Sequence, residues 1–362
     1  MDEARDMGSA RTKRAFRPKA RRRAGAYLAL AAGVVPLAVV GTGLSGASAS
    51  VRHAAPHVAG ATVILGEPLS PPEVPQQAPF VAKALGFFAR EHLTVNIAYM
   101  PNGLTSELGT TAKSITIGMA GGSDSIEAAA QHAPIHAVWV TYQKLDLVCI
   151  AGPKIKTIKD LVGADVGSTG AGGFSATTMG ACLAAGGVSP SQVKEITMTR
   201  AEFVPALASG RIQAAVFHAD DAYTVLHQIK GAHILDYEYK SLPKYWYGSL
   251  NVTDSFARTH ASVVERTIAA LMLADRWMAN PANNAKFVSL AQKDTSESRA
   301  AVQSAISFDR SIGLWNTSCA VEPSSIAYTS HLLASQGSIT RIPTFAQVYT
   351  GTYCAAAAKM IG

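Results

Sequence analysis

The stretch PFVAKALGFFAREHLTV, residues 79–95, decides the fold class because it joins a helix to the strand that follows it. Pro79 suits the first position of a helix, where a backbone N–H has no partner within the helix. Gly86 predicts a break late in this helix, which we place at residues 79–90. The run 93–98 predicts the next strand. The stretch therefore predicts one helix–strand unit of an α/β protein.

The same alternation extends over most of the chain. Seven further apolar runs predict strands: 63–65, 115–119, 137–142, 146–150, 165–167, 195–198 and 214–217. Helical patterns lie between them, and after residue 250 the chain becomes mostly helical, with a final helix predicted over 325–336. Strands that alternate with helices favour parallel sheets covered by helices. About 310 residues follow the leader described next, which is more than one core comfortably holds, so we expect two lobes.

The first 49 residues predict a secretory signal peptide. Nine Lys or Arg residues lie before or around the start of a weakly apolar run over 24–40, and the residues AlaSerAla at 47–49 form a small-x-small cleavage site. The Arg triplet at 21–23 suits twin-arginine export, with Sec export as the alternative. A transmembrane anchor is disfavoured because the run is short against the roughly 20 residues that a span needs. We therefore expect a periplasmic or other extracytoplasmic protein.

The leader also accounts for the basic charge of the chain. It holds nine basic and three acidic residues, so +6 of the net charge of +7 lies there and the remainder is close to neutral. A nucleic-acid-binding surface needs basic clusters in the folded part. The sequence shows none, and this argues against a nucleic-acid partner.

The stretch 79–95 resembles a segment near the mature N-terminus of solute-binding proteins of ABC importers. The branch in question handles aliphatic sulfonates, taurine, nitrate and thiamine-pyrimidine precursors, and the resemblance covers roughly residues 60–290. Two places depart from that family's Gly-x-x-Asp-Ile-Gly pattern. Thr116 in SITIG and Gln213 in SGRIQAA stand where an acidic residue is usual. The resemblance therefore indicates fold and class more specifically than ligand.

This resemblance implies a two-lobed periplasmic-binding-protein fold, type II-like, of the Venus-flytrap kind. Each lobe is expected to hold a mixed, mostly parallel sheet flanked by helices. Lobe 1 would take residues 60–147 and 245–362, and lobe 2 would take residues 148–244, with crossings near 147–152 and 236–246. The ligand is expected in the cleft between the lobes, outside the carboxyl ends of the strands.

The glycine-rich loop 167–175, GSTGAGGFS, is the clearest candidate for ligand binding. Small residues let backbone N–H groups point inward, and the helix that follows presents its positive N-terminal end, so a carboxylate or sulfonate suits the loop. The resemblance places a ligand loop of lobe 2 here. A purely structural strand–helix turn is the alternative. The predicted ligand contacts in this loop are Ser168, Thr169, Gly170, Gly172, Gly173, Phe174 and Ser175.

A second loop, 121–125, resembles the matching ligand loop of lobe 1. We expect Gly122 and Ser123 to contact the ligand and Asp124 to cap the helix, in a capping box with Glu127. Further candidate contacts are Glu67 after the first strand, Asn102 at a turn, and Tyr142 near a crossing.

The polar run His218 to Asp221 follows the strand 214–217. Three interpretations stay open: His218 and Asp220 contact the ligand, Asp220 or Asp221 caps a helix, or His218 and Asp220 bind a metal. The metal site lacks a visible third ligand. We therefore expect no metal and no cofactor.

Four cysteines are present. Cys149 and Cys182 lie in apolar surroundings and are predicted to be small core residues. Cys319 and Cys354 flank the C-terminal segment and either pair in an oxidising compartment or stay unpaired. No CxxC motif occurs, which disfavours a zinc or thioredoxin-like site.

The resemblance implies a non-catalytic, monomeric binding protein that delivers a small organic or anionic solute to the permease subunits of an ABC importer. It would meet the membrane only through that permease. One alternative is an enzyme of the same superfamily that acts on a pyrimidine precursor, but the cysteine-rich motif such relatives need is missing. No Gly-x-Ser-x-Gly motif indicates a hydrolase. The other alternative is a ligand-sensing partner of a membrane receptor.

Overall fold

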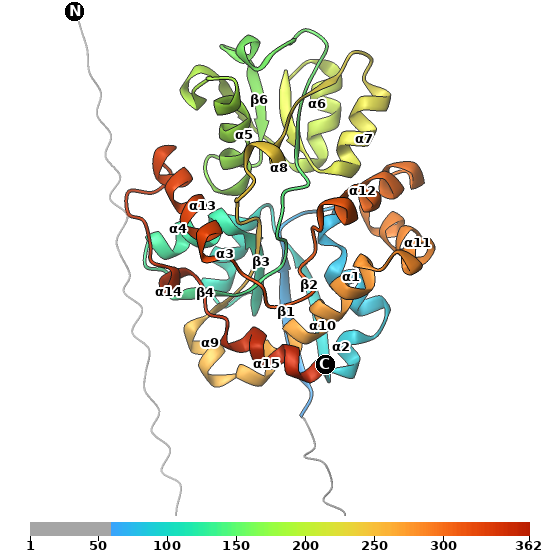
Figure 1. Cartoon of the computed structure of the whole chain (residues 1–362), viewed down its shortest axis with the longest axis vertical. Helices are drawn as coiled ribbons and strands as arrows, with labels where there is room; N and C mark the ends of the chain where they lie inside the picture. The colour runs from blue at the N-terminus through green and yellow to red at the C-terminus, as the bar shows by residue number, and fades with distance from the viewer. Residues whose placement is uncertain (1–58) are drawn as a thin grey trace, which may run out of the picture. The chain divides into compact units, whose positions relative to one another are not determined.

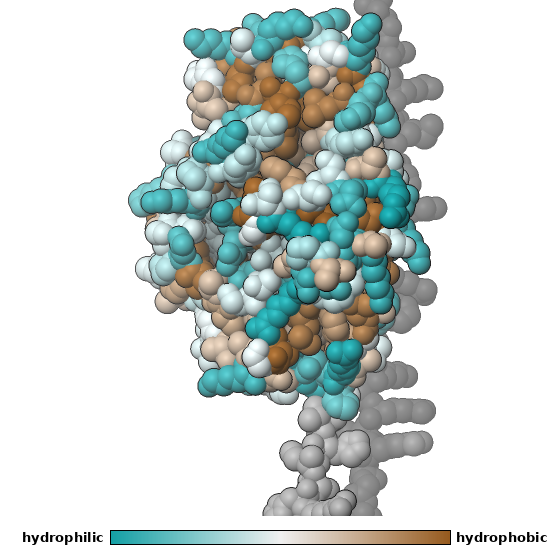
Figure 2. Space-filling model, turned by 45° about the vertical axis from the view of Figure 1, so that its right-hand side comes forward, coloured by the Kyte–Doolittle hydropathy of each residue, from teal (hydrophilic) through white to brown (hydrophobic). Residues whose placement is uncertain are grey.

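The computed structural model describes residues 59–362, which build two five-stranded mixed sheets flanked by helices (Figure 1). The predicted signal peptide lies outside the described residues. Within the described part, no helix combines the length and the apolar character that a membrane span requires. On the face in Figure 2, hydrophilic side chains are spread over most of the surface and hydrophobic ones show in separate patches.

The first sheet has the strand order β2-β1-β3-β10-β4. Strand β1 pairs in parallel with β2 and β3, whereas β10 runs antiparallel to β3 and β4. Val63 of β1 lies opposite Val95 of β2, and both side chains are buried. The strands are β1 (Ala61–Glu67), β2 (Leu93–Tyr99), β3 (Ile117–Gly121), β4 (Ile135–Val140) and β10 (Gly248–Thr253).

The second sheet has the order β7-β6-β8-β5-β9. Strand β6 pairs in parallel with β7 and β8, and β5 runs antiparallel to β8 and β9. In both sheets an antiparallel strand is therefore inserted among parallel ones. The strands are β5 (Val148–Ala151), β6 (Asp165–Ser168), β7 (Lys194–Thr197), β8 (Ala214–Phe217) and β9 (His233–Tyr237).

The chain passes from the first sheet to the second over residues 141–147 and returns over 238–247. We call the part built on the first sheet lobe 1 and the part built on the second sheet lobe 2. The residue bounds given above for the two lobes stay a prediction.

Helices cover both sheets (Figure 1). Those of lobe 2 are α5 (Gly173–Ala185), α6 (Phe203–Ser209), α7 (Ala219–Gln228) and, on the returning connection, α8 (Glu238–Ser241). Those of lobe 1 are α1 (Ala78–Ala84), α2 (Phe87–Arg90), α3 (Gly103–Thr111), α4 (Gly122–Ala130), α9 (Asp254–Thr259), α10 (Ala261–Ala279), α11 (Asn284–Thr295), α12 (Arg299–Ile312), α13 (Pro323–Ser335), α14 (Phe345–Val348) and α15 (Thr352–Ile361).

Local sequence signals explain much of this pattern. The predicted break is confirmed: Gly86 separates α1 from α2 and has a φ of 73°, a left-handed conformation that glycine adopts without strain. Apolar residues at helical spacing, among them Val264, Ile268 and Leu271, form the buried face of α10. The helix predicted over 325–336 is present as α13, but it is not the final one, since α14 and α15 follow it. Helix α15 packs against α10 and β4, and this tertiary contact has no local sequence signal.

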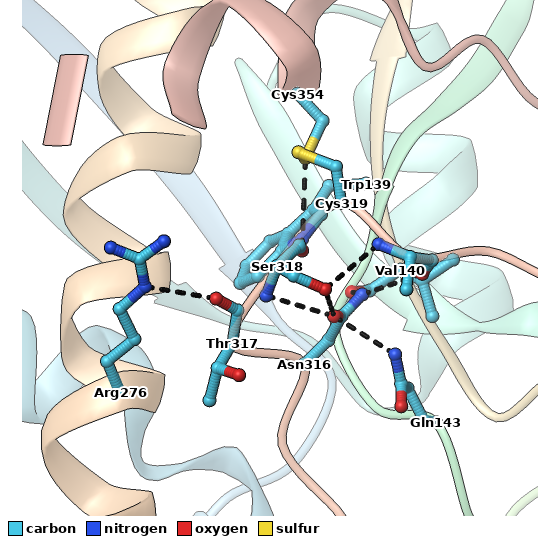
Figure 3. The surroundings of a disulfide bond; sticks show 10 residues. Trp139, Val140, Gln143, Arg276, Asn316, Thr317, Ser318, Cys319 and Cys354 are labelled. Carbon is cyan, nitrogen blue, oxygen red and sulfur yellow. Dashed lines mark hydrogen bonds between the residues drawn. A yellow bond between two sulfur atoms is a disulfide. The ribbon is translucent and has the colours of Figure 1, made fainter. Parts of the chain in front are cut away.

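Two disulfides fix distant elements. Cys319 and Cys354 are bonded, which confirms the pairing alternative and ties α15 to the segment after α12 (Figure 3). Trp139 and Arg276 hold that segment by donating hydrogen bonds to the carbonyl oxygens of Ser318 and Thr317.

The prediction for Cys149 and Cys182 is wrong in part. Both are buried, as expected of core residues, but they are bonded to each other. The bond joins β5 to α5, which the chain brings together only in the folded sheet–helix layer. Sequence spacing holds no signal for such a contact.

Candidate ligand-binding cavity between the two sheets

A cavity of about 100 Å³ lies where loops of both lobes meet. One water needs roughly 10–15 Å³ by the same kind of measure, so the cavity holds several waters or one small organic molecule. Lobe 1 contributes the ends of β1 and β3 and the starts of α3 and α4, lobe 2 contributes the loop 169–175 and His218, and the connections contribute Tyr142 and Tyr247. The remaining lining residues are Pro68, Leu69, Gln76, Asn102, Gly103, Leu104, Met119, Ala120, Gly121, Asp124 and Gly248.

The glycine loop is shaped by its own polar side chains. After β6 ends, the Ser168 hydroxyl donates to the carbonyl oxygen of Gly170 at 2.8 Å, and the Thr169 N–H donates to the Ser175 hydroxyl at 3.1 Å. Gly172 and Gly173 have φ values of 104° and 69°, so side chains at these two positions would strain the turn into α5. The loop therefore keeps its fold without a ligand contact from Ser168.

Carboxylates of lobe 1 occupy the N-terminus of α5. The Phe174 N–H donates to Asp124 Oδ1 at 3.0 Å, and the Gly173 N–H donates to Glu127 Oε1 at 3.2 Å. Asp124 Oδ2 also accepts from the Gly121 N–H at 2.9 Å. The positive end of α5 is thus neutralised by the protein's own acids, which also bridge the two lobes.

Three aromatic rings form one wall of the cavity. Phe174 stacks on Tyr247 with a centroid separation of 5.1 Å and an interplanar angle of 11°. Tyr142 is tilted by 47° against Tyr247, also at 5.1 Å. The rings come from α5 and from both connections, so the wall exists only when the lobes are together. We call Tyr142, Phe174 and Tyr247 the aromatic wall.

A buried acid–imidazole pair lies beside this wall. His218 Nδ1 lies 2.9 Å from Asp146 Oδ2, and the Tyr247 hydroxyl donates to Asp146 Oδ1 at 2.9 Å. His218 Nε2 lies 3.6 Å from Glu73 Oε2. Glu73 in turn accepts from Arg200 Nε at 2.8 Å, which joins a loop of lobe 1 to lobe 2.

Burial raises the pKa values of three acids in α3 and α4. It raises the pKa of Asp124 to about 6, although the N–H groups of Gly121 and Phe174 oppose the shift. It raises the pKa of Glu127 to about 7, helped by the nearby charge of Asp124. It raises the pKa of Glu107 to about 8, opposed by the hydrogen bond from Ser125. A carboxyl whose pKa rises on burial lacks a compensating positive charge.

Comparison with known proteins now places the chain. A family model described as NMT1/THI5 like matches residues 75–284, more than half of the sequence. The chain belongs to the NMT1/THI5-like family. No curated protein matches the sequence.

Solved structures share the fold of this NMT1/THI5-like chain at low sequence identity. The alkanesulfonate-binding protein SsuA from Xanthomonas axonopodis pv. citri, bound to MOPS, is 16% identical with a TM-score of 0.65, over 81% of this chain and 99% of that one. The periplasmic nitrate-binding protein NrtA from Synechocystis PCC 6803 is 14% identical with a TM-score of 0.65, over 83% and 89%. The desulfurization enzyme DSZB is 13% identical with a TM-score of 0.57, over 83% and 99%. The expected periplasmic-binding-protein fold is confirmed.

The structure brings most of the predicted contacts to one cavity. The predicted residues in its lining are Asn102, Tyr142, Thr169, Gly170, Gly172, Gly173, Phe174, Ser175 and His218. Those outside its lining are Glu67, Gly122, Ser123, Ser168 and Asp220.

The predicted contacts that lie outside the cavity lining have other surroundings. Gly122 packs against Trp246, where a Cβ would collide with the Trp246 backbone oxygen. Ser123 and Glu67 are fully buried. Asp220 accepts from the Val74 N–H at 2.9 Å and so links the lobes. Among the described residues, no three metal-ligating side chains are grouped so that they could hold a metal ion.

The predicted capping box is displaced by three residues. Helix α4 begins at Gly122, so Asp124 is its third residue and closes the box on the Gly121 N–H, while Glu127 lies one turn further on. Sequence reasoning also missed Gln76, which lies in a short 3₁₀ turn after β1 and lines the cavity. A glutamine in a proline-rich loop gave no signal for this.

Proposed function

We propose that this NMT1/THI5-like chain is an extracytoplasmic solute-binding protein that closes its two lobes around a small solute. One observation carries the proposal: a single cavity takes its walls from both lobes and both connections. A site of this kind is complete only in the closed arrangement, so binding and closure are coupled.

Direct contacts across the lobes define that closed arrangement. Asn102 Nδ2 donates to the carbonyl oxygen of Thr169 at 3.2 Å, and the Phe174 N–H donates to Asp124. The Val74 N–H of lobe 1 also donates to Asp220 of lobe 2. Opening the lobes breaks these bonds, and a solute held in the cavity shifts the population toward closure by its affinity for the closed form.

The names of two structural neighbours support solute binding outside the cytoplasm. SsuA and NrtA are binding proteins for an alkanesulfonate and for nitrate, and NrtA is periplasmic. We propose that the closed form docks as a monomer on the permease subunits of an ABC importer, and that the protein works without cofactor or metal. The signal peptide predicted for residues 1–49 would bring it there.

A thermal-shift screen tests solute binding. The panel includes alkanesulfonates, taurine, nitrate, aromatic carboxylates, amines and hydroxymethyl-pyrimidine. A true ligand at a hundred times its Kd adds about 2.7 kcal/mol to the free energy of unfolding. Leu104→Trp fills the cavity from the start of α3 and is expected to abolish the shift. Val162→Trp is the matched control, because Val162 is exposed and does not line the cavity. A shift that survives Leu104→Trp contradicts the proposal.

The pair of Asp146 and His218 supports a second candidate, an enzyme. A buried carboxylate that holds an imidazole at a cavity is the arrangement of a general base, and DSZB shows that this fold hosts an enzyme. Mass analysis of the bound solute after long incubation separates the two functions. A binding protein returns the solute unchanged, whereas an enzyme converts it and loses that conversion in His218→Asn.

A further inference from the structure

If the proposed function holds, the charges of the residues that line the cavity restrict which solutes can bind. Among the described residues that line the cavity, none is Lys or Arg, and Asp124 is the single carboxylate. The one guanidinium of the adjoining network, Arg200, is held by Glu73 at 2.8 Å and Asp221 at 3.3 Å. His218 has Asp146 on one ring nitrogen and Glu73 near the other. Each basic group near the site therefore faces at least one acid.

Four backbone N–H groups of the glycine loop are also engaged. In the glycine loop the N–H groups of Thr169 and Gly170 donate to serine hydroxyls, and those of Gly173 and Phe174 donate to Glu127 and Asp124. An anion at the start of α5 would have to displace two carboxylates. The usual anion site of such a helix is thus already filled.

Oxygen atoms remain available instead. Gln76 and Tyr142 line the cavity and are 4% and 5% exposed. Gln76 Oε1 and the Tyr142 hydroxyl oxygen have no hydrogen-bond partner among the described residues. Buried oxygens without donors favour a ligand that brings N–H groups or positive charge.

The aromatic wall also favours a positively charged ligand. The faces of Tyr142, Phe174 and Tyr247 carry negative electrostatic potential, which attracts an ammonium group placed over a ring. An apolar ring of the solute would also pack against this wall.

We propose that the cavity selects a small organic cation, an amine or ammonium group on a compact or planar body, over sulfonates, carboxylates and nitrate. Asp124 supplies the counter-charge, Gln76 and Tyr142 accept hydrogen bonds, and the aromatic wall holds the body. This specificity differs from the ligands named for SsuA and NrtA.

Calorimetric titration with matched probes tests the charge preference. Benzylammonium, benzyl alcohol and benzenesulfonate share one ring and differ in charge, and methylammonium, methanol and methanesulfonate repeat the series on a smaller body. At pH 8, above the pKa of Asp124, at least one cation is expected to bind ten times more tightly than its neutral partner. The matching sulfonate is expected to give no heat of binding.

Two variants assign the effect to the cavity. Asp124→Asn is expected to weaken cation binding at least ten times more than it weakens binding of the neutral probe, whose loss reflects only the cross-lobe hydrogen bond from the Phe174 N–H. Tyr142→Phe keeps the ring and removes the hydroxyl oxygen that lines the cavity, so it is expected to weaken cation binding and provides a second test should Asp124→Asn fail to fold. Asp160→Asn, at an exposed acid outside the cavity, is the control and is expected to change nothing.

Several results overturn the cation proposal. They are a sulfonate that binds as tightly as its cationic match, an equal loss for all probes in Asp124→Asn, or no binding of any cation. If a sulfonate bound as tightly as its cationic match and Leu104→Trp abolished that binding, the proposed solute-binding function would still stand. A failure of the solute-binding function itself would instead show as no shift with any member of the wider thermal-shift panel.

Discussion

At the scale of single residues, close packing rather than ligand contact explains several small side chains around the cavity. Gly122 is the clearest case, because α4 begins directly against the returning connection. A Cβ at this position would collide with the backbone oxygen of Trp246 and come within 2.7 Å of its indole ring. The glycine therefore lets β3 and α4 approach the connection that carries Tyr247.

Replacing this glycine tests the packing. Gly122→Ala is expected to lower the free energy of unfolding by about 1–3 kcal/mol, since the backbone must shift to admit a methyl group. Gly152→Ala is the matched control, because its Cβ would lie 3.6 Å from the nearest atom, a side-chain carbon of Leu207. Urea unfolding of both variants measures the difference. Equal effects would refute the packing account.

Buried acids make the stability of the fold depend on pH. The Glu107 carboxyl accepts from the Ser125 hydroxyl at 2.9 Å, and burial raises its pKa from 4.5 to about 8. Between these values the folded chain keeps a proton that the unfolded chain has lost. The free energy of unfolding therefore falls as the pH rises from about 5 to 8, by up to about 1.4 kcal/mol per pH unit for this group.

Glu107→Gln removes this contribution, because the amide is neutral at every pH and keeps an oxygen for Ser125. Thermal unfolding at pH 5 and pH 8 is expected to show a smaller decrease in Tm for the variant than for the wild type. The same decrease in both proteins would show that Glu107 titrates normally in the folded chain.

At the scale of elements, α5 is the part that connects the site to the fold. Its first turn holds Phe174 against Tyr247 and receives the carboxylates of α4, and its C-terminal part is bonded to β5 through Cys182 and Cys149. The disulfide thus fixes the helix that presents the glycine loop. The second disulfide fixes α15, which lies outside the cavity lining.

The two disulfides form a matched pair for an experiment. They close loops of 33 and 35 residues, so removing either by a double Cys→Ala change is expected to cost a similar amount, about 2–4 kcal/mol of unfolding free energy. Only the loss of the Cys149–Cys182 bond is expected to weaken solute binding. Equal binding in both double variants would contradict a positioning role for this bond.

Local patterns predicted the elements well and their partners poorly. The strand 214–217, the break at Gly86 and the glycine loop before α5 each depend on a few neighbouring residues, and the structure has all three. The Cys149–Cys182 bond and the position of α15 depend on residues far apart in the chain. The hydrogen bond between Asp124 and the N-terminus of α5 could not be predicted from local sequence either, because it forms only when the two lobes meet.

At the scale of the whole molecule, the cavity and the cross-lobe hydrogen bonds both form where the two lobes meet. The loops at one edge of each sheet face each other, and the connections over 141–147 and 238–247 contribute Tyr142 and Tyr247 to the same space. Contacts of Asp220 with Val74 and of Arg200 with Glu73 add to the interface beside the cavity. A solute in this cavity therefore contacts both lobes, and its binding depends on their relative position.

The most direct test of this account is a crystal structure of the protein grown with the solute that gives the largest thermal shift. We predict electron density for one solute molecule against the aromatic wall, within hydrogen-bond distance of Asp124, Gln76 or Tyr142, and enclosed by both lobes. Density for the solute at any other place, or contacts with one lobe alone, would contradict the central claim that the two lobes close on a small solute.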